Sequence, residues 1–341
     1  MYLLLALAGG FASSLAADDS AVVLMYHRFG EDRYPSTSIR VDQFEAQIAH
    51  LQERDYPVIP LADLLDALAN DTPLPERAVV ITVDDAYLSV HEVAYPRLKA
   101  AGFPFTVFVA TDPVDDGLPA YMSWEQMREM AAGGASYANH GAAHRSVMER
   151  EEGQGKTEWL AAVQADVERG WTRLSAELEP LPGVFAYPYG EFDIATANLI
   201  EAAGYVAFGQ QSGAVARDSD RRALPRFPMA ENFADIDGFR TKVASLPLPG
   251  ASAAPWDPVT VERRPRVEIA LSRELARWQE LACFVGGQGR VEVDWLEDGR
   301  RFSVGPARDF GTGRQRVNCT APGPSGRYYW FSHPGLISNT N

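Results

Sequence analysis

The sequence predicts an α/β protein built on a parallel sheet, followed by a smaller all-β region. From Val22 to about Ser245, short apolar runs alternate with stretches in which apolar residues recur at helical spacing. This alternation is typical of a parallel sheet, which can be closed into a barrel or left open. Beyond residue 256 the helical spacing stops and short β-like runs take its place.

Six apolar runs are expected to form the strands of the parallel sheet. They cover residues 22–26, 78–83, 105–109, 135–139, 184–186 and 205–208. The helices between them carry recognisable end signals: Gly102 is a stop signal, and Ser123 with Gln126 forms a capping box. Helices are expected near residues 44–51, 61–68, up to 101, 123–132, 157–177 and 194–203.

Residues 246–256 are rich in proline, glycine and alanine, which predicts a linker. The expected division is therefore a first domain at 17–245 and a β-rich, sandwich-like domain at 257–341. Glu297-Asp298-Gly299 lies between two β-like runs and predicts a hairpin turn. The two cysteines, Cys283 and Cys319, form either one disulfide or two buried free thiols, and the sequence leaves both open.

The first 16 residues form a short apolar stretch that ends in small residues, and they predict a signal peptide cleaved before Ala17. The protein is then expected to be secreted or periplasmic. No lysine or arginine precedes the apolar run, so an ordinary N-terminal tail is the alternative. No later run approaches the roughly 20 apolar residues that a membrane-spanning helix needs.

The chain has 341 residues, of which 46% are hydrophobic, and a net charge of -15. This composition predicts a globular protein with a substantial core. Acidic residues are spread along the whole chain, so nucleic acid and anionic lipid are not expected partners. A neutral or cationic partner fits the charge better.

The most informative motif is the pair Asp84-Asp85, which directly follows the apolar run 78–83. Two adjacent carboxylates at the end of a buried strand raise each other's pKa unless a cation or a shared proton compensates them. The pair is therefore a candidate for metal chemistry.

Two further motifs follow later strands. His140 and His144 come after the run 135–139, and Tyr187-Pro188-Tyr189-Gly190 comes after 184–186. In parallel α/β folds, catalytic groups gather where the strands end, so these side chains are expected on one face. A carboxylate and two imidazoles form the usual three-ligand set of a catalytic zinc-like ion. Taken alone, the two histidines are equally well explained as surface residues.

Together, the ordered motifs Asp84-Asp85, His140 with His144, and Tyr187–Gly190 resemble the polysaccharide deacetylase family, also called the NodB-homology domain or carbohydrate esterase family 4. The resemblance covers about Val22 to Ser245. The opening Leu24-Met25-Tyr26-His27 is most similar to the bacterial branch with the poly-β-1,6-N-acetylglucosamine deacetylases. The resemblance implies a distorted (β/α) barrel, a divalent metal and hydrolysis of N-acetyl groups on a sugar polymer.

Carried over to this sequence, the resemblance implies that Asp85, His140 and His144 hold the metal. Zinc is the expected ion, with cobalt or nickel as alternatives. Asp84 would be the general base, because a carboxylate kept ionised by the cation can accept a proton from water. The backbone N–H of Tyr189 would stabilise the oxyanion.

The sequence also departs from the family pattern. No late Leu-x-His motif follows Gly190 to supply the general acid, so His27 is proposed instead; hydrogen bonding to a neighbouring loop is the alternative for His27. Ala186 stands where the family has the arginine that orients the base. Arg226 is the proposed replacement, with a surface position as the alternative. Ala86 replaces a glycine, which would cost of order 1 kcal/mol if that position needs a positive φ.

The expected function is a metal-dependent hydrolase that removes N-acetyl groups from N-acetylglucosamine-containing polymers, acting on carbon–nitrogen bonds other than peptide bonds. One alternative is a catalytically silent carbohydrate-binding protein on the same fold. Another is a metal-dependent hydrolase of other amides or esters, such as the N-acetyl groups of peptidoglycan. The sequence leaves the polymer linkage and the oligomeric state open.

Overall fold

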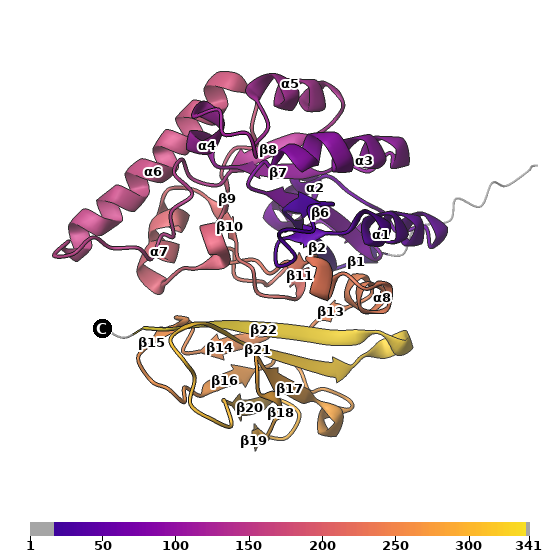
Figure 1. The fold of residues 1–341 in the computed structure, drawn as a ribbon. Coiled ribbons are helices and arrows are strands. Elements are labelled where there is room, and N and C mark those ends of the chain that lie inside the picture. The colour runs from indigo at the N-terminus through magenta and orange to yellow at the C-terminus, as the bar shows by residue number, and fades with distance from the viewer. Residues whose placement is uncertain (1–16, 339–341) are drawn as a thin grey trace, which may run out of the picture.

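The computed structural model describes residues 17–338, and its centre is a parallel sheet of six strands (Figure 1). The strands lie in the order β10-β9-β8-β7-β6-β2. Their bounds are β2 Ser20–Tyr26, β6 Ala78–Asp84, β7 Thr106–Val109, β8 Ser136–Asn139, β9 Val184–Ala186 and β10 Val206–Phe208. All six coincide with the predicted apolar runs to within about two residues at each end, because buried parallel strands are apolar on both faces.

A segment late in this part of the chain connects the two ends of the sheet. Leu224 bridges Phe208 of β10 in parallel, and β12 (Phe227–Pro228) pairs in parallel with Leu24 and Met25 of β2. The antiparallel strand β11 (Ala214–Ala216) pairs with the first half of β2. The sheet therefore closes into a distorted barrel, which confirms the predicted fold class.

Helices follow the strands and surround the barrel (Figure 1). Gly102, the predicted stop signal, is the left-handed C-cap of helix α3 (Tyr95–Ala101). At the start of helix α5 (Trp124–Ala132), Ser123 Oγ accepts the Gln126 N–H as the capping box requires. The helices are α1 Val41–Glu53, α2 Leu61–Asn70, α3 Tyr95–Ala101, α4 Thr111–Asp115, α5 Trp124–Ala132, α6 Lys156–Glu177, α7 Ile194–Ala202 and α8 Ile236–Val243. Of these, α4 and α8 were not expected from the sequence.

The C-terminal part forms two sheets that share one apolar core. The first has the order β13-β22-β21-β17-β18, with β15 beside β22, and the second has the order β14-β16-β20-β19. Cys283 and Cys319 are opposite each other on β17 and β21 and form a disulfide, the first of the two alternatives. The strands are β13 Leu246–Pro247, β14 Ser252–Ala254, β15 Val259–Thr260, β16 Val267–Ala270, β17 Ala282–Val285, β18 Gly289–Val291, β19 Val293–Glu297, β20 Arg301–Val304, β21 Gly313–Pro322 and β22 Tyr328–Ile337.

The C-terminal part differs from the sequence-based expectation in one of two features. The turn at 297–299 does join the antiparallel strands β19 and β20. Residues 246–256 are not a free linker, because β13 pairs with β22 and β14 pairs with β16. Leu248 between them is buried in the sandwich core, so burial of this apolar side chain outweighs the local proline and glycine signals. The assignment of 17–245 and 257–341 as separate domains remains a prediction.

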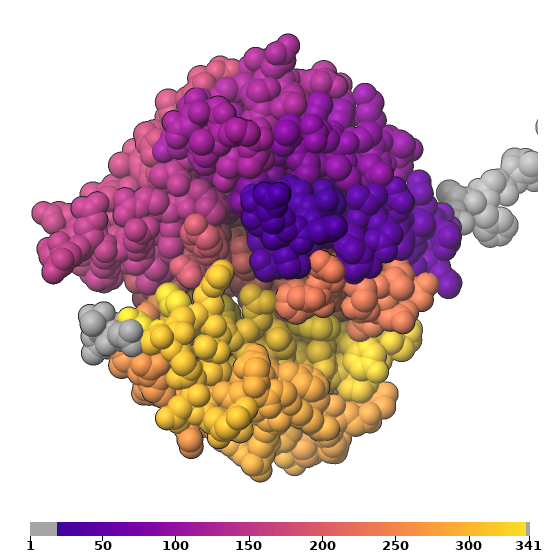
Figure 2. Space-filling model, in the orientation of Figure 1, coloured from indigo at the N-terminus to yellow at the C-terminus, as the bar shows by residue number. Residues whose placement is uncertain are grey.

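The sheet of the sandwich that contains β21 and β22 lies against the barrel (Figures 1 and 2). Trp330 of β22 packs edge-on against Phe227 of β12, with ring centroids 5.1 Å apart. The proposed signal peptide lies outside the described residues. Within residues 17–338, no helix is both long and apolar enough to cross a bilayer.

Candidate metal centre and catalytic site

Asp85, His140 and His144 meet at the carboxyl edge of the parallel sheet. Asp85 directly follows β6, and His140 directly follows β8. The Nε2 atoms of His140 and His144 lie 3.2 and 2.8 Å from the same atom, Oδ1 of Asp85. One potential ligand atom from each residue lies within 4.8 Å of the others. The structure thus brings together the three residues that were predicted to hold the metal.

The backbone after β6 separates the two aspartates. Asp85 and Ala86 have φ angles of 77° and 61°, so both lie in the left-handed region. The turn sends Asp85 toward the histidines, while Asp84 ends the strand and contacts Arg226. Ala86 therefore occupies a position that favours glycine, and its strain is of order 1–2 kcal/mol.

The polar atoms at this point fit a cation. Oδ1 of Asp85 is buried and accepts no hydrogen bond within the described residues. Nδ1 of His140 lies 2.7 Å from the carbonyl oxygen of Ala186, so this nitrogen donates and Nε2 presents a lone pair. A carboxylate oxygen and two imidazole nitrogens that converge in this way form a donor set for a divalent cation.

Helix α6 positions the loop that carries the two histidines. The carboxylate of Asp166 accepts the N–H groups of Ala142 and Ala143, both at 3.1 Å. Gly170 lies so close to the loop that an added Cβ would be 2.6 Å from the carbonyl carbon of Gly141. Neither residue was predicted to belong to the site, because an aspartate and a glycine in a polar helix give no distinctive signal.

Asp84 is held by Arg226 inside the barrel. The guanidinium donates Nη1 to Oδ1 at 2.7 Å and Nη2 to Oδ2 at 2.8 Å, and both side chains are fully buried. The remaining donors of Arg226 reach Thr82 Oγ1 and the carbonyl oxygen of Gly209. Burial opposes ionisation of Asp84, but Arg226, His140 and His27 together outweigh it, so the pKa of the carboxyl lies below its usual range.

The position of Arg226 explains how it reaches Asp84. It lies on the segment that connects β10 to β2, and 0% of its surface is exposed. The alternative of a surface arginine is therefore wrong. No feature of the sequence predicts this burial directly, since arginine side chains are mostly exposed.

His27 also lies near the carboxylate of Asp84. Its Nε2 is 3.9 Å from Asp84 Oδ2, and 14% of its side chain is exposed. Burial lowers the pKa of His27, although the nearby carboxylates of Asp85 and Asp84 act in the opposite direction. The imidazole is thus placed where it can exchange a proton with a group bound beside Asp84.

Tyr189 lies beside His144 at the exposed edge of the site. It has a φ of 61°, its ring packs 4.8 Å from that of His144, and 43% of its surface is exposed. Within the described residues its backbone N–H has no acceptor. Burial, followed by the Asp85 carboxylate, raises the pKa of its phenol.

Comparison with known proteins agrees with this geometry. Residues 71–208 match the family model described as polysaccharide deacetylase. These residues contain Asp84-Asp85, both histidines and Tyr187–Gly190. This part of the chain is therefore similar to the polysaccharide deacetylase family.

Individual relatives give the same result. The putative polysaccharide deacetylase YxkH of Bacillus subtilis is 28% identical over 207 residues, which are 60% of this chain and 69% of that protein. The poly-β-1,6-N-acetyl-D-glucosamine N-deacetylase of Escherichia coli K12 is 25% identical over 230 residues, which are 57% of this chain but only 34% of that protein. The solved structure of IcaB from Ammonifex degensii has a TM-score of 0.55 and 27% identity, and covers 67% of this chain and 97% of that one.

The contact between α6 and the histidine loop generates a first prediction. Gly170→Ala should weaken Zn²⁺ binding by about 10- to 100-fold, the usual effect of disturbing groups that orient metal ligands. Calorimetric titration of the metal-stripped chain measures this. Gly311→Ala is the matched control, because its added Cβ meets no atom within 4 Å. Equal affinity in wild type and Gly170→Ala would contradict the role assigned to this contact.

Proposed function

We propose that the protein is a metal-dependent deacetylase that hydrolyses the N-acetyl groups of N-acetylglucosamine-containing polymers. The observation that carries the proposal is the convergence of Asp85, His140 and His144 next to an aspartate that is paired with a buried arginine. The names of the relatives, polysaccharide and poly-N-acetylglucosamine deacetylases, support the same substrate class.

Asp85, His140 and His144 would hold a divalent cation, with zinc as the expected ion and cobalt or nickel as alternatives. When bound, such a cation lowers the pKa of a water molecule and polarises an amide carbonyl. Asp84 then accepts the proton of the attacking water. Arg226 keeps Asp84 ionised and fixes the direction of its carboxylate, since the bidentate contact leaves the carboxylate no freedom to rotate.

The remaining steps fall to Tyr189 and His27. The free N–H of Tyr189 would donate to the oxyanion that forms on the acetyl carbon; one such donor is typically worth about 3 kcal/mol of barrier. His27 would deliver a proton to the nitrogen of the leaving glucosamine. Because burial lowers its pKa, His27 holds a proton weakly and gives it up readily.

A catalytically silent carbohydrate-binding protein is less consistent with this site. Binding a sugar alone needs neither a buried ion pair at Asp84 nor three converging metal ligands. A second candidate function is the hydrolysis of other amides, including the N-acetyl groups of peptidoglycan.

The proposal includes a location outside the cytoplasm, secreted or periplasmic, with residues 1–16 as a signal peptide. The disulfide between Cys283 and Cys319 supports it, because disulfides persist in oxidising compartments.

The role of Asp84 can be tested by Asp84→Asn. This change should lower acetate release from soluble N-acetylglucosamine oligomers by about 100-fold or more, as expected when a general base is removed, while the bound metal stays near the wild-type amount. Acetate is measured enzymatically and metal by elemental analysis. Metal-loaded wild type that releases no acetate from any such polymer would overturn the proposed function.

The role of His27 gives a separate prediction. His27→Ala should reduce kcat by about 100-fold, a typical contribution of a general acid, with bound metal unchanged. His91→Ala is the control, because His91 is a partly exposed histidine that contacts Glu129 on the outer helices. Unchanged turnover in His27→Ala would remove His27 as the acid.

A further inference from the structure

A cavity of about 440 Å³ lies beside the metal centre, between the barrel and the C-terminal sheet. Tyr189, Gln210 and Phe233 line it from the barrel, and Arg314 and Arg316 of β21 line it from the sheet. The ring of Tyr189 also packs against the metal-ligand candidate His144. The cavity therefore begins directly next to the proposed site of deacetylation.

The alternation of β21 directs its two arginines toward the barrel. Val317 and Cys319 point into the sandwich core, so residues 314, 316 and 318 lie on the opposite face. Two contacts agree with this: Arg314 Nη1 donates to the carbonyl oxygen of Tyr189 at 3.1 Å, and Ser212 Oγ lies 3.2 Å from Asn318 Oδ1.

The positive charges of these arginines are poorly compensated. Arg316 is half-buried, yet within residues 17–338 it makes no side-chain hydrogen bond, ion pair or ring contact. Burial, followed by the neighbouring Arg314, lowers its pKa. Arg314 contacts the Tyr189 carbonyl oxygen and forms a long ion pair with Glu191 at 3.6 Å, and 58% of its side chain is exposed. A buried cation without a partner is costly, and an anion in the cavity would remove that cost.

We propose that Arg314 and Arg316 form a substrate subsite for an anionic substituent, a carboxylate or a phosphate, on a sugar unit near the one that is deacetylated. The proposal rests on the proposed function and narrows its substrate class to acidic N-acetylated polymers. The guanidinium fork suits both anions. The net charge of -15 does not prevent this, because charges beyond about 8 Å are screened at physiological salt, whereas the arginines would touch the anion.

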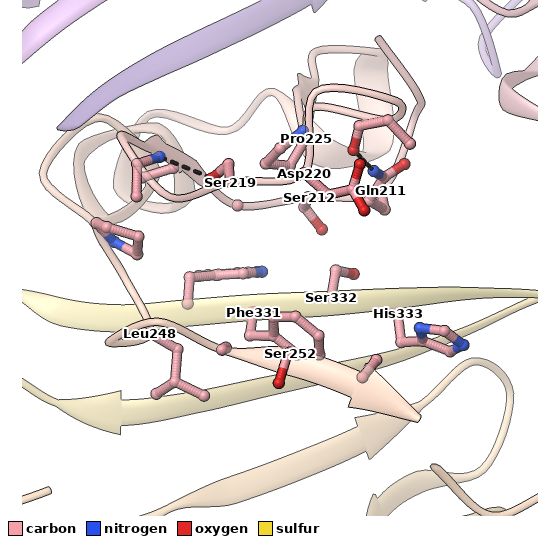
Figure 3. Close-up of a pocket in the computed structure, with 18 of the residues that line it drawn as sticks. Gln211, Ser212, Ser219, Asp220, Pro225, Leu248, Ser252, Phe331, Ser332 and His333 are labelled. Atoms are coloured by element: carbon pink, nitrogen blue, oxygen red, sulfur yellow. Dashed lines mark hydrogen bonds between the residues drawn. The ribbon is translucent and has the colours of Figure 1, made fainter. Parts of the chain in front are cut away.

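A second cavity, of about 450 Å³, leaves room for more of a polymer. It shares Phe192, Gln211 and Pro334 with the first cavity, so the two adjoin. Figure 3 shows Gln211 on the barrel side of this cavity and Ser332 on the sheet side. Hydroxyl and amide groups of this kind suit the hydroxyls of further sugar units.

The test compares kcat/KM on three N-acetylglucosamine oligomers of equal length. One is neutral, one carries a 3-O-lactyl carboxylate on alternate units, and one carries 6-phosphates. Arg316→Gln and Arg314→Gln should each lower kcat/KM on at least one acidic oligomer by about 10-fold or more, as expected for a charged hydrogen bond, and on the neutral oligomer by less than about 2-fold. Whichever acidic oligomer is affected identifies the anion. The control is Arg290→Gln on the exposed strand β18, which should change neither value.

Equal losses on neutral and acidic oligomers, or no loss on either acidic one, would overturn the subsite. Thermal unfolding checks the folding of Arg316→Gln, and the exposed Arg314 provides a second variant. If wild type releases no acetate from any oligomer, the proposed function fails. Calorimetric binding of the acidic oligomers to wild type and Arg316→Gln then tests the subsite separately: tenfold weaker binding by the variant supports it, and equal binding overturns it.

Discussion

The ion pair between Arg226 and Asp84 is the interaction on which the rest of the barrel site depends. Both groups are fully buried, so either one alone would be an uncompensated charge in the interior, at a cost of about 3–5 kcal/mol. The arginine is located on the segment that connects β10 to β2, while the aspartate ends β6 in the middle of the sheet. The same contact therefore ties the closing segment to the sheet and holds the carboxylate of Asp84, the proposed base, in one orientation.

The pair also explains how two adjacent aspartates can do different work. Asp84 faces a guanidinium inside the barrel, whereas the left-handed backbone at Asp85 and Ala86 turns Asp85 toward two imidazoles. Each carboxylate thus has its own partner, and the repulsion expected from the sequence is relieved without a shared proton. The barrel supplies these partners from strands that are distant in the sequence, and the C-terminal sheet borders the site through its contact with Tyr189.

Much of the fold could be predicted from the sequence, because buried parallel strands are recognisable as apolar runs and the helices carry clear end signals. The strand pairing of residues 246–254 could not be foreseen: Leu248 is buried beside β22, a strand far later in the sequence, and local composition contains no information on such pairing. In the site, the residues that end strands were foreseeable. Asp166 and Gly170 could not be foreseen. Both contact the backbone of the loop that carries the two histidines, and these contacts exist only after α6 packs on that loop.

We propose that Asp85, His140 and His144 form one cation site beside Asp84, the proposed base. The most direct measurement is calorimetric titration of the metal-stripped chain with Zn²⁺, for wild type, His140→Gln and the control His91→Gln. We expect one cation per wild-type and control chain. The affinity of His140→Gln should be at least 10-fold lower, because losing a ligand should cost at least as much as losing a group that only orients one. Equal affinity in all three chains, or no binding by wild type, would contradict it.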